Sequence, residues 1–127
     1  MQIGEREQKE LNNYFIRTWI EDEVIPLAQK EDFSANDLRE SYQQFRQDHP
    51  QASFTLPDLW AAAMELGDFI VALKLIDPII AILKEDLDHL KTTGNQLEIN
   101  TQAAEKKIEA LIEGLSRQRK PLVNRMF

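Results

Sequence analysis

Few residues of this chain have the types and spacing needed for chemistry, and the best placed of them surround His89. Glu85 and Asp86 precede His89 by four and three residues, a spacing that would put three potential metal ligands on one helical face. The chain has two histidines and no cysteine, so no second carboxylate–histidine pair completes such a site. We therefore interpret His89 as a solvated surface residue and expect no metal and no cofactor.

A second group with chemical potential is the run of carboxylates Glu21-Asp22-Glu23. Consecutive helical positions point in different directions, so this run favours a solvated acidic face over a catalytic cluster. The sequence has no Gly-rich phosphate loop, no Gly-x-Ser-x-Gly elbow and no His-Glu-x-x-His motif. We expect a protein that is not an enzyme, in which the three carboxylates serve a partner-binding surface.

The charge of the chain is divided unevenly between its halves. The whole chain of 127 residues has a net charge of −7. Residues 1–67 hold six Lys+Arg and thirteen Asp+Glu, whereas residues 68–127 hold nine of each. The acidic excess therefore belongs to the first half, and it disfavours nonspecific binding of the whole chain to nucleic acid or anionic membranes.

The apolar segments are too short or too interrupted for a membrane helix. The most apolar stretch, residues 69–83, contains Lys74, Asp77 and Pro78 and is shorter than the ~20 residues that a spanning helix needs. The first residues show no basic region followed by an apolar run, so no signal peptide is predicted. We expect a cytoplasmic protein without membrane contact.

The first half predicts three helices with well-marked ends. Apolar residues at helical spacing indicate a helix over about 5–24, which Pro26 should end or kink. Ser34 and Thr55 are each followed three residues later by Asp, so both are predicted N-caps of further helices. Gly67 is the natural residue just after the third helix.

Trp60, in the third of these helices, is the best candidate for an anchor in a protein contact, because tryptophan is enriched among residues that dominate binding energy. Its helical spacing also suits burial in the core, and that interpretation is favoured.

The second half carries apolar residues at alternating steps of three and four from Leu73 onward, which is the heptad pattern of a coiled coil. Asp77-Pro78 has the pattern of a helix start, with Asp as the N-cap and Pro as the first helical residue. We predict that the heptad seam forms an oligomer interface. Its members are Ile80, Leu83, Leu87, Leu90, Leu97, Ile108, Leu111, Leu115 and Leu122.

Residues 92–95, Thr-Thr-Gly-Asn, leave two alternatives for the path of the chain. They form either the loop of an antiparallel helical hairpin or a weak point in one long helix. The heptad pattern passes through Gly94 without a change of phase, which slightly favours the continuous helix.

The end of the chain is basic, with Arg117, Arg119, Lys120 and Arg125 in nine residues that contain no acid. These side chains are candidates for phosphate contacts. Cations at a helix C-terminus also interact favourably with the helix dipole, and we favour this explanation.

Residues 34–69 resemble the helical part of small helix-turn-helix or winged-helix domains found beside phage and plasmid replication proteins. The resemblance is carried by Ser34-Ala35, Asp37-Leu38, Tyr42, Phe45, Phe54 and Leu66-Gly67-Asp68-Phe69. It implies a DNA-reading second helix, yet the helix between Thr55 and Leu66 has no basic residue and no wing sequence follows it. Because the residues that would read DNA are missing, the resemblance implies that residues 34–69 form a helical unit used for protein contacts.

The sequence as a whole predicts an all-α fold, with a short N-terminal helical bundle followed by a C-terminal coiled coil or antiparallel helical hairpin. Residues 1–67 would be an acidic three-helix region. Residues 68–127 would be an apolar connector helix and a heptad region with a basic tail, in one structural unit with the first. We expect a non-enzymatic adaptor that forms homo-oligomers through its heptad region and binds a protein partner with its N-terminal helices. The alternatives are a nucleic-acid-associated accessory protein and an acidic inhibitor that mimics nucleic acid.

Overall fold

A computed structural model describes residues 4–126 of the chain, and within them all regular structure is helical. This confirms the all-α prediction. The elements are α1 (Glu5–Trp19), the π-helical turn η1 (Ile20–Val24), α2 (Ile25–Ala28), α3 (Ala35–Asp48), α4 (Leu56–Glu65), α5 (Phe69–Leu97) and α6 (Gln102–Met126).

Pro26 does not end the first helix, which was one of the two predicted outcomes, and the helical backbone runs on to Ala28. Pro26 removes one backbone N–H, and the helix widens into the π-helical turn η1 directly before it. At the far end, the Lys74 ammonium group donates to the carbonyl of Ala28 at 2.7 Å. A side chain of α5 therefore satisfies a backbone group that the short helix α2 leaves free.

Both predicted N-caps are confirmed. The Ser34 side chain accepts a hydrogen bond from the backbone N–H of Asp37, and the Asp37 carboxylate accepts one from the N–H of Ser34. Thr55 and Asp58 repeat this reciprocal pair at the start of α4. Gly67 follows α4 with φ at +76°, the left-handed conformation predicted for it.

A single hydrophobic core joins the two halves of the chain, and Trp19 lies at its centre with no exposed surface. Three aromatic rings surround the Trp19 ring, with centroids at 5.5 Å for Phe45, 5.6 Å for Tyr42 and 5.7 Å for Phe54. Buried aliphatic residues of α5, among them Leu75 and Ile79, complete the core.

Helix α5 begins earlier than the Asp77-Pro78 signal suggested. Asp68 caps it by accepting from the N–H of Val71 at 3.2 Å, and Pro78 lies buried inside the helix. The prediction of a helix start at Pro78 was wrong because most of the apolar residues before it, among them Val71, Leu75 and Ile76, pack into the core and hold the helix together. The connector and the first heptads are therefore one helix of 29 residues.

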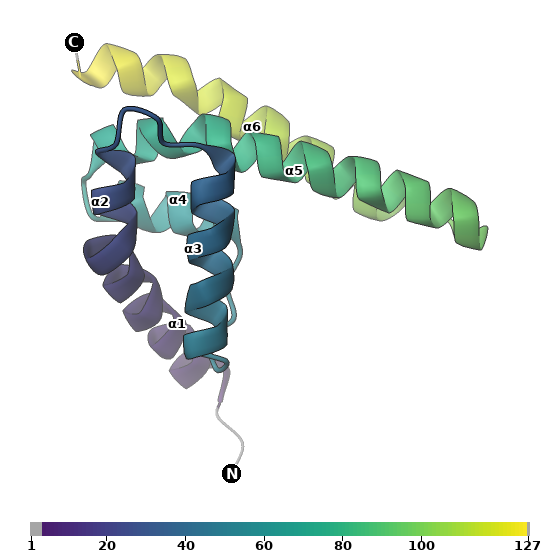
Figure 1. Cartoon of the computed structure of the whole chain (residues 1–127), viewed down its shortest axis with the longest axis horizontal. Helices are drawn as coiled ribbons and strands as arrows, with labels where there is room; N and C mark the ends of the chain where they lie inside the picture. Colours follow the sequence, from purple (N-terminus) through teal and green to yellow (C-terminus); the bar gives the residue numbers. More distant parts are fainter. Residues whose placement is uncertain (1–3, 127) are drawn as a thin grey trace.

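Helices α5 and α6 form an antiparallel hairpin, and α6 returns along α5 toward the bundle (Figure 1). Of the two alternatives for residues 92–95, the antiparallel hairpin is confirmed and the favoured continuous helix is wrong, but the hairpin turn does not lie at 92–95. These residues are helical, and the chain turns immediately after them, between Glu98 and Thr101. Glu98 adopts a left-handed conformation (φ 54°) and closes the helix in the way that glycine usually does.

Candidate interaction surfaces

The distal half of the hairpin stands clear of the bundle. We call residues 87–108 the arm, which comprises the end of α5, the turn and the start of α6 (Figure 1). After Leu83, the only buried residue of α5 is Gly94, which faces the turn. The arm is therefore two helices thick, and no further layer of the described residues 4–126 covers it.

The apolar residues of the arm are only partly covered by each other. Leu87, Leu90 and Ile108 are half-buried along the line where the two helices meet. Leu97 and Ile99, at the tip, are 62% and 58% exposed. The arm thus presents apolar surface at its end and along its seam.

The predicted oligomer interface is divided by the fold. Ile80, Leu83, Leu115 and Leu122 are buried in the hydrophobic core of the single chain, so they serve the monomer. The members that lie on the arm or at its base remain accessible to different degrees; they are Leu87, Leu90, Leu97, Ile108 and Leu111. A second copy would meet this accessible group.

A groove of about 630 Å³ lies where the base of the arm meets α3 and the start of α4. One wall is formed by polar side chains of α3. These are Arg39, Tyr42, Gln43, Arg46 and Gln47. The apolar surface comes from the start of α4, from α5 and from α6. Its residues are Leu56, Pro57, Ile82, Leu83 and Leu111.

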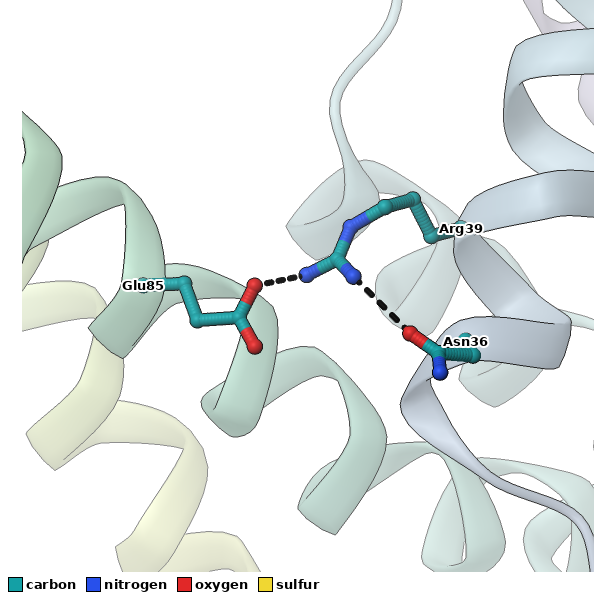
Figure 2. A network of polar contacts seen from close by, with 3 residues as sticks. All are labelled: Asn36, Arg39 and Glu85. Carbon is teal, nitrogen blue, oxygen red and sulfur yellow. Dashed lines mark hydrogen bonds and ion pairs between the residues drawn. The ribbon is translucent and has the colours of Figure 1, made fainter.

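An ion pair closes the edge of this groove between α3 and α5. The Arg39 guanidinium donates to the carboxylate of Glu85 and, through its other terminal nitrogen, to the side-chain oxygen of Asn36 at 3.1 Å (Figure 2). The Glu85 side chain is 65% exposed, so the pair adds no more than about 1 kcal/mol to stability. Its effect is to orient Arg39 along the wall.

Tyr42 and Arg46 have different roles in the same wall. The Tyr42 hydroxyl donates to the carbonyl of Phe54, and burial raises the pKa of Tyr42 while the charge of Arg46 opposes that shift. The Arg46 guanidinium lies 5.7 Å from the centre of the Tyr42 ring. Among residues 4–126, no carboxylate lies within ion-pair distance of Arg46.

The polar wall of the groove is positively charged, although residues 1–67, the half of the chain that builds this wall, have a negative net charge. Residues 1–67 contain thirteen acids and six basic residues, yet two arginines and no acid from this half line the groove. Asp86, on α5, is the one acidic lining residue. The α3 side of the groove is therefore a cationic strip in an acidic surface.

The acidic run Glu21-Asp22-Glu23 lies on η1 and takes no part in this groove. Glu21 and Asp22 are exposed. Glu23 is half-buried and accepts from the Ser41 hydroxyl at 3.1 Å, and that hydroxyl accepts from the Trp19 indole N–H at 2.9 Å. Glu23 thus helps to anchor the central tryptophan, which leaves two carboxylates for a partner.

Trp60 is half-buried, and its indole N–H donates to the carbonyl of Ala72 at 3.0 Å. It connects α4 to α5 inside the molecule, as the core interpretation favoured, and a partner would reach only part of its ring.

The basic residues near the chain end are mostly engaged with the chain itself. Arg119 pairs with Asp77 on α5, and Arg117 pairs with Glu113 one turn earlier. Arg125 lies over the ring of Phe69 at 4.7 Å, and Lys120 is exposed. Phosphate binding by the three arginines would compete with these contacts.

The sequence interpretation did not single out the groove. A signal was present, because Arg39, Tyr42 or Gln43, and Arg46 recur at the spacing of one helical face. Polar residues at that spacing also describe any solvated helix face, and only the packing of α5 and α6 beside α3 makes this face the wall of a groove.

Comparison of the chain with protein-family models, with curated proteins and with solved structures finds no match. Within the described residues 4–126, no helix is both long and apolar enough to cross a membrane, and no three His, Asp or Glu side chains are grouped to hold a metal ion.

Proposed function

We propose that this protein is a non-enzymatic helical adaptor that pairs with a second copy through its arm and binds a protein partner with its N-terminal helices. The observation that carries the proposal is the arm itself, a projecting pair of helices whose apolar residues are covered on one side only.

Pairing of two arms would cover the apolar residues that a single arm leaves partly exposed. A helical hairpin becomes a four-helix bundle, with apolar residues packed in a closed core, when a second hairpin packs against it. Fully burying an exposed leucine or isoleucine stabilises an association by about 1.5–3 kcal/mol. Leu97 and Ile99, which are 62% and 58% exposed, supply two side chains from each copy that could contribute part of this energy.

Light scattering coupled to size exclusion tests the pairing over a wide range of protein concentration. The wild type should show the mass of a dimer, and the double variant Leu97→Glu/Ile99→Glu should show that of a monomer. Thr92→Glu is the matched control, because Thr92 is an exposed position of α5 on the side opposite the seam. A wild type that stays monomeric throughout the range contradicts the pairing.

The partner-binding part of the proposal is supported by the groove beside α3 and can be tested separately. A photo-cross-linking amino acid at position 47, on the groove wall, should capture a host protein that the same group at the exposed position 10 on α1 does not. Equal capture from both positions would show that the N-terminal helices have no specific docking surface at the groove.

A further inference from the structure

We infer that the groove between α3 and the base of the arm receives an amphipathic helix with an acidic edge, presented by a protein partner. The inference rests on the adaptor function proposed above, and it specifies the chemistry that the partner must have. Three features of the groove carry it: the apolar surface, the cationic wall and the helical character of every side.

The apolar surface calls for an apolar face on the occupant. Leu111 is 43% exposed although it belongs to the heptad series, and it lies in the groove beside Ile82 and Leu83. Leu56 adds a further apolar side chain from the first residue of α4. Leu56, Ile82 and Leu83 are themselves buried and form the apolar floor of the groove, so an occupant with leucine-type residues at steps of three and four would chiefly cover Leu111.

The helical sides of the groove favour a helix over an extended peptide. An extended segment gains affinity by pairing its backbone with a free sheet edge, and the described part of the chain has no strand. The walls are helices whose backbone groups largely bond within the same helix, and the start of α4 is closed by the Thr55–Asp58 pair. A helix satisfies its own backbone groups and needs only side-chain contacts.

The cationic wall decides the charge of the occupant. Arg46 has no carboxylate within ion-pair distance among the described residues, and Arg39 is held toward the groove edge by Glu85. An acidic edge facing α3 would pair with Arg46, whereas a basic edge facing α3 would meet Arg46 and Arg39, the second of which is already paired with Glu85. Complementary charge of this kind selects partners and sets the orientation in which they bind.

A displayed library of amphipathic helical peptides, randomised at the flanking positions, tests the inference directly. After selection on the wild-type protein, the bound peptides should be enriched in Asp and Glu along one flank of their apolar face. Individual peptides should lose affinity by about tenfold or more on Arg46→Glu and on Leu111→Glu. Arg17→Glu, which reverses an exposed arginine of α1 away from the groove, should leave their affinity unchanged.

Each other outcome overturns the inference. A library that yields no binders, enriched peptides with basic flanks, or binding that is equally sensitive to Arg17→Glu would exclude an acidic helix at this site. Competition by a fluorescent single-stranded DNA would assign the cationic wall to nucleic acid. Loss of the wild-type dimer in Arg46→Glu would make the occupant a second copy of this chain. Dimerisation through the arm and capture of a host protein from position 47 would survive the first three outcomes, so failure here is separable from failure of the adaptor function.

Discussion

Gly94 shows how one residue sets the geometry of the hairpin turn. It lies inside α5, where alanine is ordinarily about 1 kcal/mol more favourable than glycine. A Cβ atom at this position would lie 2.9 Å from the side chain of Thr101 and 3.3 Å from the carbonyl oxygen of Ile99. Gly94→Ala should therefore lower the free energy of unfolding by about 1 kcal/mol or more, as measured by urea denaturation.

Gly114 provides the control for that prediction. It is a helical glycine of α6, and an added Cβ would meet nothing within 4 Å. Gly114→Ala should raise the free energy of unfolding by up to about 1 kcal/mol. If both alanine variants are stabilised alike, the close approach of Thr101 to Gly94 is refuted.

Glu98 is the reverse case of Gly94, because a residue with a side chain occupies a backbone conformation that favours glycine. Its left-handed conformation lets the N–H of Ile99 bond to the carbonyl of Gly94 at 2.9 Å, which closes the end of α5. Glu98→Gly should stabilise the protein by about 1 kcal/mol in thermal or urea denaturation. Glu98→Ala removes the same charge without relieving the backbone, so an equal gain in that variant would assign the effect to charge.

Tyr42 makes the stability of the fold sensitive to alkaline pH. Burial raises its pKa above the ordinary value of 10.0, with Arg46 opposing the shift, so the folded state holds the phenol proton more tightly than the unfolded chain. The resulting stability is present below pH 10.0 and is lost as pH rises through the higher folded-state pKa. Tyr42→Phe should show a shallower alkaline loss of stability, whereas Tyr14→Phe, at a 64% exposed position, should follow the wild type.

At the scale of elements, helices α3 and α4 depend on the same capping arrangement. In each, a hydroxyl residue accepts from the backbone three positions on, and an aspartate returns the bond. Ser34→Ala and Thr55→Ala should each lower the free energy of unfolding by about 1 kcal/mol. The two losses should add, since the caps share no partner. Ser116→Ala, at an exposed interior position of α6, should cause no such loss; a loss equal to the capped positions would argue against the capping bonds.

Helix α5 combines two environments along its length. Up to Leu83 most of its residues are buried by the bundle or α6, and in the arm it is supported by α6 alone. The same helix is therefore a core element at its start and a projecting element at its end. This division lets the apolar residues of the arm remain accessible without exposing the core.

At the scale of the whole molecule, the fold predicts unequal stability between the bundle and the arm. At low protein concentration, amide protons of residues 87–97 should exchange faster than those of residues 71–83, although both lie in α5. Hydrogen exchange followed by mass spectrometry measures the difference. Arm pairing should slow exchange in 87–97 as concentration rises, and uniform exchange along α5 at low concentration would show that the arm is not a separate weak unit.

Local signals in the sequence determined the ends of several helices. Ser34, Thr55 and Gly67 occupy the predicted positions, because capping and left-handed glycine depend on residues within one helical turn. The heptad pattern likewise predicted that the second half is helical with one apolar seam. These features need no information from distant parts of the chain.

The tertiary structure decided where that seam finds its partner. A heptad pattern is the same whether the facing helix belongs to the same chain or to another, so spacing alone left the hairpin and the long helix open. The chain turns at Glu98, and glutamate seldom adopts the left-handed conformation found there. The sequence therefore held no local signal for the position of the turn. The groove brings together residues of α3, α4, α5 and α6 that lie far apart in sequence. Its cationic wall becomes one side of a groove only because α5 and α6 pack beside α3 at the base of the arm, a contact that depends on the whole fold.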